Sequence, residues 1–379
     1  MTRAPPGATS PSPGEKVVAF RLTRHHLETR ADRSDLASVV RDVCGVQAQL
    51  PSGAEIALWA RIRGLTRDDV ERALWKDRSI VRTWAMRGTV HLLPADDLSV
   101  YVAALRETTG RDTEAWLLRS GLSLRDIEAT TKAIVKALSE GPLTRDELAG
   151  RAGAGFPAKV RSWLAHGWGG LLKPASFAGL VCFGPDRGSE VTFVRRDRWM
   201  TRWREVPPAE AVAELLRRYL RAYGPATPVD FAGWSGMSVK AANECAEAIR
   251  TDLVEISDGG GALLLREDLR VLESLPPHRR IVRLLPNFDV FLLGHRDKGH
   301  LVNAAHYKRV YRKAGWISPV VLVDGRVAGV WSRARRARRL DVRVEPFLKL
   351  PRDVHDAVES EASDLARFLE ADDVRVTFT

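Results

Sequence analysis

Cysteine is scarce in this 379-residue sequence. Its three cysteines, Cys44, Cys182 and Cys245, lie far apart, with no C-x-x-C pair and no histidine at ligand spacing. This pattern is typical of the reducing cytoplasm and predicts no structural zinc. Three histidines are separated by five and six residues, which fits neither one helical face nor a zinc finger, so we expect no metal and no cofactor. They are His295, His300 and His306.

Long apolar runs and the common catalytic signatures are also missing. No stretch of about 18 apolar residues occurs, so we expect no membrane-spanning helix. Residues 1–15 are rich in proline, glycine and serine, and we predict a disordered tail there, not a signal peptide. The sequence contains no phosphate-binding loop, no G-x-S-x-G motif and no assignable Ser-His-Asp order. Nothing therefore indicates a P-loop nucleotide-binding protein or a serine hydrolase.

Basic residues, by contrast, are abundant, and 59 of them against 48 acidic residues give a net charge of +11. This excess favours a polyanionic partner, because each phosphate contact releases condensed counterions, although a GC-rich genome also produces arginine-rich proteins. Two basic segments are candidates for DNA contact, and a solvated surface turn is the alternative for both. The candidate residues are His295, Arg296 and Lys298 in one loop, and Arg335, Arg336 and Arg338 in the run 333–339.

The middle of the sequence contains an internal repeat. Residues 141–149 (GPLTRDELA) are echoed 83 residues later by residues 224–232 (GPATPVDFA). Apolar residues at helical spacing precede each copy, and Thr144 and Thr227 are placed to cap the next helix. Another helical stretch follows, 158–172 in the first copy, and then two extended segments joined by a turn. Three helices followed by a β-hairpin are the winged-helix pattern, whose middle helix pair is a helix-turn-helix.

The two ends of the chain complete the predicted architecture. Helical stretches at 36–49, 54–63 and 67–75, followed by a hairpin turning near Arg87-Gly88, predict a diverged third winged helix. After residue 275 strands predominate, including one at 281–294 and a hairpin on Asp324-Gly325, with a helix from 353 to 370.

We therefore predict an α+β fold with three tandem winged-helix domains and a C-terminal small β-barrel or sheet. The predicted boundaries are a tail at 1–15, winged helices at 16–120, 121–205 and 206–275, and a barrel or sheet at 276–379.

Gln47 and Gln49 are two amides two residues apart, flanked by apolar or small residues. They would lie on or just after a helix of the first winged helix. Glutamine is common on helix surfaces, so a structural role is one interpretation of the pair. In the other, both side chains face a cleft and hold a water molecule against a scissile bond. Arg87 and His91, at the bend and return strand of the hairpin, could face the same cleft.

Taken together, four motifs resemble the AlkZ-like family of bacterial winged-helix DNA glycosylases. The match runs from about residue 18 to residue 340, and its motifs are specific jointly rather than singly. They are residues 46–49 (VQAQ), 57–61 (ALWAR), 83–92 (TWAMRGTVHL) and 284–297, which holds LLPNFD and GHRD.

This resemblance implies three winged helices and a β-barrel that form a basic channel for double-stranded DNA. It also implies excision of alkylated purines, including bulky N7-alkylguanine adducts and cross-links from genotoxic natural products, in repair or self-resistance. The family's Gln-x-Gln motif falls on Gln47 and Gln49 as catalytic residues. The residues that would shape the site are Trp84, Arg87, Thr89 and His91.

Two amides suit this chemistry, because an N7-alkylated guanine is already cationic and leaves without a strong acid. Only Lys76 lies within the N-terminal motifs, so we expect a monofunctional enzyme without lyase activity. We expect a monomer that is cytoplasmic and acts at the nucleoid. The alternative is a winged-helix transcription regulator that responds to a small molecule.

Overall fold

The computed structural model describes residues 12–200, 202–256, 260–276 and 280–379. It begins with helix α1 (Pro13–Arg24), whose start is fixed by a capping box: the Ser12 hydroxyl accepts from the Glu15 backbone N–H, and the Glu15 carboxylate accepts from the Ser12 N–H. The predicted tail therefore extends too far, because its residues 13–15 are helical. Its remaining part, 1–11, lies outside the described residues. No described helix is both long enough and apolar enough to span a membrane.

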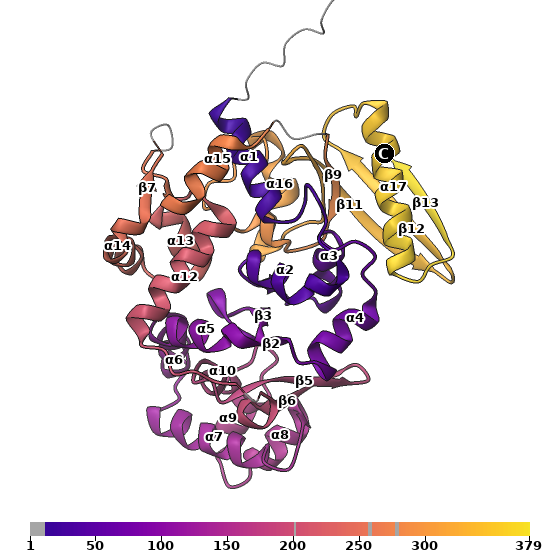
Figure 1. Ribbon diagram of the computed structural model, residues 1–379. Helices are drawn as coiled ribbons and strands as arrows, with labels where there is room; N and C mark the ends of the chain where they lie inside the picture. The colour runs from indigo at the N-terminus through magenta and orange to yellow at the C-terminus, as the bar shows by residue number, and fades with distance from the viewer. Residues whose placement is uncertain (1–11, 201, 257–259, 277–279) are drawn as a thin grey trace, which may run out of the picture.

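A first unit of helices and a hairpin occupies the centre of the molecule (Figure 1). Its elements are α2 (Leu36–Asp42), α3 (Pro51–Trp59), α4 (Arg67–Glu71), β1 (Val46–Gln47), β2 (Ile80–Trp84) and β3 (Val90–Pro94), with sheet order β1-β3-β2. The predicted helix 36–49 is wrong beyond Asp42. Cys44 and Gly45 both have positive φ, which ends the helix and turns the chain into β1. The hairpin turn at Arg87-Gly88 is confirmed.

A second unit forms the lower part of the molecule in Figure 1, and α5 (Leu98–Leu105) and α6 (Arg111–Arg119) lead into it. Its elements are α7 (Leu124–Ala137), α8 (Arg145–Ala152), α9 (Ala158–Leu164), α10 (Leu172–Phe177), β4 (Leu143–Thr144), β5 (Val181–Arg187), β6 (Glu190–Arg195) and α11 (Arg196–Trp199). Thr144 caps α8 as predicted, accepting from the Glu147 N–H at 3.3 Å. The predicted helix 158–172 ends at Leu164, and a loop at 165–171 separates it from α10, which begins at Leu172.

A third unit repeats this pattern on the left of Figure 1. Its elements are α12 (Pro208–Tyr223), α13 (Pro228–Ser235), α14 (Val239–Ala248), β7 (Leu253–Glu255), β8 (Leu263–Leu265) and α15 (Leu269–Ser274). Thr227 caps α13 as Thr144 caps α8, accepting from the Asp230 N–H at 3.2 Å. The repeat in the sequence therefore corresponds to two copies of one helix-cap-helix arrangement.

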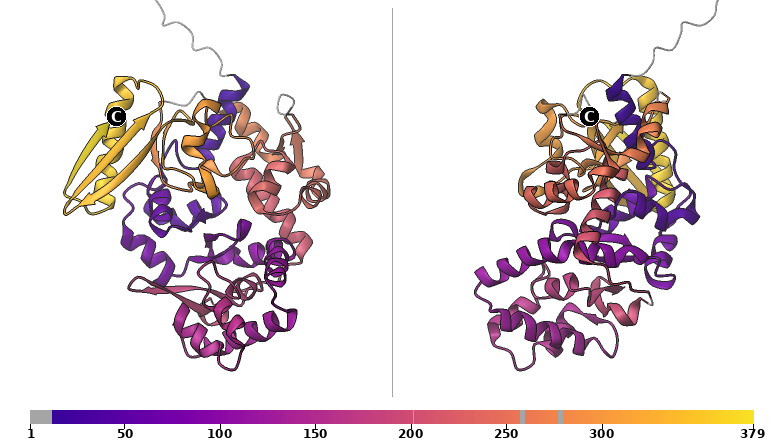
Figure 2. Two further views of the ribbon diagram at one scale, coloured as in Figure 1. Left: turned by 180° about the vertical axis from the view of Figure 1, so that it is seen from behind. Right: turned by 60° about the vertical axis from the view of Figure 1, so that its left-hand side comes forward.

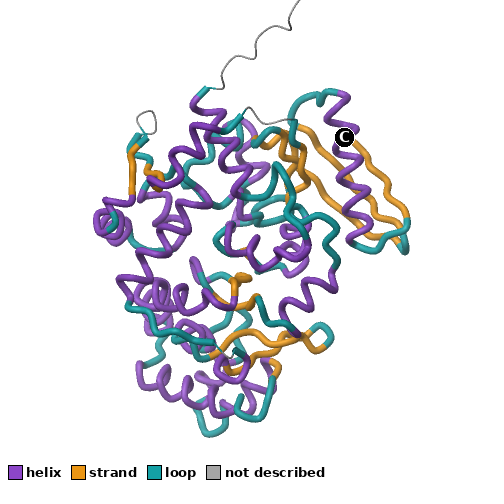
Figure 3. Tube along the Cα trace, in the orientation of Figure 1, coloured by secondary structure: helices purple, strands orange, loops and turns teal. Residues whose placement is uncertain are grey.

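The C-terminal region is an open five-stranded sheet, so of the two predicted forms, barrel or sheet, the structure has the sheet (Figure 3). Its elements are β9 (Val282–Leu285), α16 (Tyr307–Val310), β10 (Val320–Val323), β11 (Arg326–Arg336), β12 (Arg339–Pro346), α17 (Arg352–Phe368) and β13 (Asp373–Phe378). The strand order is β13-β12-β11-β10-β9, and β13 runs parallel to β12. The predicted strand 281–294 ends at Leu285, because Phe288 adopts φ +58° and Asp289 caps a 3-10 turn.

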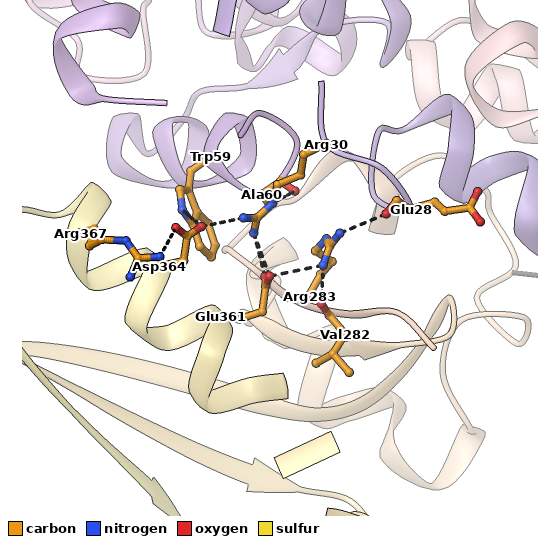
Figure 4. Close-up of polar contacts among 9 residues, drawn as sticks. All are labelled: Glu28, Arg30, Trp59, Ala60, Val282, Arg283, Glu361, Asp364 and Arg367. Carbon is orange, nitrogen blue, oxygen red and sulfur yellow. Dashed lines mark hydrogen bonds and ion pairs between the residues drawn. The ribbon is translucent and has the colours of Figure 1, made fainter. Parts of the chain in front are cut away.

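A polar cluster joins this sheet to the first unit (Figure 4). Arg30 donates to Asp364 at 2.6 Å and to both carboxylate oxygens of Glu361 at 2.9 and 3.0 Å, and its guanidinium lies over the Trp59 ring. Arg283 of β9 pairs with the same Glu361 at 3.3 Å. Helix α17, which packs on β9 and β13, is thereby held against α3 (Figure 2).

Candidate active site

The two glutamines lie at β1 and just after it. They are the only glutamines in the sequence, a signal that composition alone could have supplied. Because side chains alternate along extended chain, residues two apart share a face, and Gln47 and Gln49 line the same cavity of about 640 Å³. Gln47 is 8% exposed, whereas Gln49 is exposed. The structure thus brings the pair together at a cavity, which is the arrangement that the second interpretation of the pair requires.

Arg87 holds the amide of Gln47 in place. Its Nη2 donates to Gln47 Oε1 at 3.0 Å, and its Nη1 donates to the Trp234 carbonyl at the end of α13. Arg87 sits in the turn between β2 and β3 with φ +57°, so a strained hairpin turn of the first unit reaches the third unit. Burial lowers the pKa of Arg87 to about 10, which leaves it charged at neutral pH.

The other predicted site residues divide into two groups. Thr89 and Trp84 line the cavity; the Thr89 hydroxyl donates to the Met86 carbonyl at 3.1 Å. His91 is paired with Gln47 in the β1–β3 register, but it is 2% exposed and lies outside the lining. Its Nδ1 lies 3.0 Å from the Thr89 carbonyl, and burial, with Arg87 nearby, lowers its pKa to about 3. His91 is therefore a buried, neutral neighbour of Gln47 that does not itself line the cavity.

The opposite side of the cavity comes from the C-terminal half of the chain. Phe288 and Trp316 line it, with their rings edge to face at 5.1 Å. Asp289, the neighbour of Phe288, forms a buried ion pair with Arg61 that fixes this part of the chain. Both side chains are 0% exposed, and the N–O distances are 2.7 and 2.8 Å. The motifs at 57–61 and 284–297 thus meet directly, which the sequence resemblance did not indicate.

The predicted basic loop folds back on the third unit. His295 is 8% exposed and its Nε2 lies 2.9 Å from the Tyr223 carbonyl, while Lys298 donates to the His295 carbonyl. Burial lowers the pKa of Lys298 to about 8 and that of His295 well below its ordinary value. Arg296 is exposed, although its backbone N–H is bound by Asp230 at 2.8 Å. Burial argues against direct DNA contact by His295, and Arg296 keeps a side chain free to make one.

The arginine run lies at the tip of the β11–β12 hairpin. Arg335 donates to the carbonyls of Leu369 and Glu370 at 2.7 and 3.0 Å. Arg336 pairs with Asp341 at 3.1 Å, and Arg338 pairs with Asp372. All three are exposed but already partnered, and none lines the glutamine cavity.

Several basic residues in the lining of the glutamine cavity and of an adjoining one were not singled out by the sequence analysis. A second cavity, of about 700 Å³, shares Trp316 with the first and has four basic residues in its lining. They are Lys308, Arg309, Arg312 and Arg333. The run HYKRVYRK at 306–313 is a signal that could have found three of them. On the other side, Arg145 and Lys173 line the glutamine cavity itself, and burial lowers the pKa of both.

The site therefore combines two amides, of which Gln47 is held by Arg87, with an aromatic and apolar lining and with basic residues in this cavity and the adjoining one. Within the described residues no three histidine, cysteine, aspartate or glutamate side chains come together as metal ligands. Positioned amides can hold a water molecule and present dipoles to a developing positive charge, while the cations can contact phosphates.

Comparison with known proteins places this geometry in a family. The model of the family "DNA glycosylase AlkZ-like" matches residues 40–368. An interstrand DNA cross-link repair glycosylase from Streptomyces sahachiroi is 36% identical over 360 residues, which cover 93% of this chain and 95% of the relative. The solved structure of the Streptomyces sahachiroi DNA glycosylase AlkZ superposes with a TM-score of 0.85 at 34% identity, covering 98% of this chain and 100% of that one. The chain belongs to the AlkZ-like family of DNA glycosylases, which act in DNA repair.

Proposed function

We propose that this protein is a monofunctional DNA glycosylase that hydrolyses the N-glycosidic bond of alkylated purines, in particular bulky N7-alkylguanine adducts and cross-links formed by genotoxic natural products. The observation that carries the proposal is the Gln47 amide, held by Arg87 at 3.0 Å in a cavity that also contains Gln49. The name of the Streptomyces relative, a cross-link repair glycosylase, supports the cross-link part.

The mechanism rests on positioning rather than on acid–base catalysis. An N7-alkylguanine carries a positive charge and departs without protonation. Gln47 Oε1 accepts from Arg87 and keeps a second lone pair for a water molecule. Gln49 Oε1 faces the Val90 N–H at 3.4 Å, a long contact that leaves this amide free to turn toward substrate. The two amides then hold a water molecule against C1′, and their carbonyl dipoles stabilise the positive charge of the oxocarbenium-like transition state.

Undamaged purines should resist this site, because a neutral base needs help to leave and an amide is no general acid or base at neutral pH. The lining includes three large aromatic residues, Trp84, Phe183 and Phe288, which suits a large planar adduct.

We assign the hydrolytic step to water, without a covalent intermediate. Lys173 lines the same cavity, so the absence of lyase activity has its own test. After incubation with alkylated DNA, borohydride should trap no covalent protein–DNA complex, because no imine forms. A trapped complex that disappears in Lys173→Arg would instead make the enzyme bifunctional.

The three helix-and-hairpin units would act as tandem winged helices in a monomer that binds double-stranded DNA. Their first and third members are tied together by Arg87, which gives one continuous binding face without a second subunit. Because its substrate is DNA, we propose that the enzyme acts in the cytoplasm, at the nucleoid.

The test is release of the modified base from a duplex that contains one N7-alkylguanine, detected by mass spectrometry under single-turnover conditions. Wild-type protein should release it, and the double variant Gln47→Ala, Gln49→Ala should lose activity by roughly 10²–10³-fold, as when a transition-state dipole is removed. Leu348→Ala, at a 77% exposed position outside the cavity lining, is the control and should be fully active. No release, or full activity in the double variant, contradicts the proposal. Tight binding of one operator sequence without base release would favour the alternative function, a winged-helix transcription regulator.

A further inference from the structure

Trp168 is the most exposed aromatic residue among the large apolar side chains that the structure describes. It is 71% exposed and lies in the loop 165–171 between α9 and α10. An exposed indole offers a large planar apolar face, and its burial by a ligand would be favourable. Trp168 lines two cavities, the glutamine cavity and a neighbouring one of about 430 Å³.

The loop is built to hold Trp168 at this rim. Gly169 and Gly170 both have positive φ, and their backbones press on other aromatic residues. A Cβ on Gly169 would lie 2.7 Å from Trp84 Cζ2, and one on Gly170 would overlap the Trp163 carbonyl. No other residue type fits these two positions without displacing the loop. The loop that carries Trp168 is therefore held in place against Trp84, one of the residues that line the glutamine cavity.

Further contacts anchor the loop from both sides. The backbone N–H of Trp168 donates to His166 Nδ1 at 3.3 Å, and the His166 ring stacks on Trp163 with centroids 4.8 Å apart. Arg145 donates to the His166 carbonyl at 3.0 Å. The indole of Trp168 thus stands on an ordered support while its own face is open, which is the arrangement of a preformed stacking platform.

Cations flank this platform. Lys173 also lines both cavities, with its Nζ 3.6 Å from where a Cβ on Gly88 would lie. Arg87 borders both cavities from the same turn. A planar face beside cations is what an unpaired nucleotide requires, with a base to stack and a phosphate to neutralise.

We propose that Trp168 forms a nucleobase-stacking subsite beside the glutamine cavity, occupied by an unpaired base of the damaged duplex while the lesion faces Gln47 and Gln49. The proposal rests on the glycosylase function proposed above. Its ligand class is a purine or pyrimidine that has left the duplex stack, either opposite the lesion or next to it on the same strand. The apolar indole reads the base by its planar face, so the subsite is tolerant of sequence.

The experiment measures binding to a 25-mer duplex with a central tetrahydrofuran abasic analogue, which needs no catalysis. Trp168→Ala should bind roughly 5- to 150-fold more weakly than wild type, the range for loss of one base–aromatic stack. Trp168→Phe should retain most of the affinity, because a smaller aromatic face remains. The slope of log Kd against log salt should stay unchanged, since no phosphate contact is removed.

Leu348→Ala removes another exposed apolar side chain and should bind as wild type does. A second duplex, abasic on both strands at the same position, identifies the stacked base. If the penalty of Trp168→Ala vanishes there, the base opposite the lesion is the ligand; if it persists, a base next to the lesion is.

Equal affinity of Trp168→Ala and wild type for the first duplex overturns the subsite. So does a loss in Trp168→Phe as large as that in Trp168→Ala, which would indicate a packing defect. The two proposals fail separately. A binding penalty without any release of N7-alkylguanine by wild type removes only the glycosylase proposal, whereas base release with unchanged binding removes only the subsite.

Discussion

The buried ion pair between Arg61 and Asp289 should be the most costly polar contact of the site to break. We consider Arg61→Met, which keeps an unbranched apolar side chain but removes the guanidinium and its charge. The guanidinium makes three hydrogen bonds: to Asp289 Oδ1 and Oδ2 at 2.7 and 2.8 Å, and to the Ala57 carbonyl at 2.8 Å. Both residues are fully buried, so Asp289 would be left as an unpaired buried carboxylate.

Removing one partner of such a pair destabilises by about 3–5 kcal/mol. Asp289→Asn should cost a similar amount, because the guanidinium then loses its counter-charge. The double variant Arg61→Met, Asp289→Asn leaves no buried charge at this position. The double variant should therefore lose less free energy of unfolding than the two single variants lose together, by about 2–3 kcal/mol.

Urea unfolding followed by tryptophan fluorescence measures these differences, provided that the m-value stays constant. The same variants should also release N7-alkylguanine more slowly, because Asp289 neighbours Phe288 in the cavity lining. Single costs below about 1 kcal/mol, or single costs that add without coupling, would refute the view that this pair positions the C-terminal side of the cavity.

Two further predictions concern pH and salt. Burial depresses the pKa of His91 and His300 to about 3, so both stay neutral in the folded state. The unfolded chain, by contrast, takes up a proton at each histidine below about pH 6.5. The free energy of unfolding should therefore fall by about 1.4 kcal/mol per pH unit for each histidine as the pH drops from about 6.5 toward 3. Urea midpoints between pH 5 and 8 check this, and a flat profile would contradict it. For DNA binding, Lys308→Gln and Arg312→Gln should each reduce the salt slope by about 0.9, whereas Arg335→Gln, whose guanidinium binds the Leu369 and Glu370 carbonyls, should leave it unchanged. The reverse pattern would place DNA at the β11–β12 tip.

Local interactions made a large part of the fold predictable. Thr144 and Thr227 cap helices through their own third neighbours, so a short motif suffices to place both helix starts. The hairpin turns at Arg87-Gly88 and Asp324-Gly325 follow from turn residues between apolar strands in the same way. The elements that failed, such as the helix expected through Gln49, are those in which a distant partner overrides local preference: β1 exists because Val46 and Gln47 pair with Leu92 and His91.

The sequence by itself determined the identity of the amide pair, the repeated helix caps and the excess of positive charge, because residue type and short spacing carry that information. Only the tertiary structure decided how these parts meet. Arg87 reaches a carbonyl 147 residues away, Arg61 reaches a carboxylate 228 residues away, and His295 is buried. Such contacts depend on how separate units pack, and packing is set by the whole apolar surface rather than by any motif.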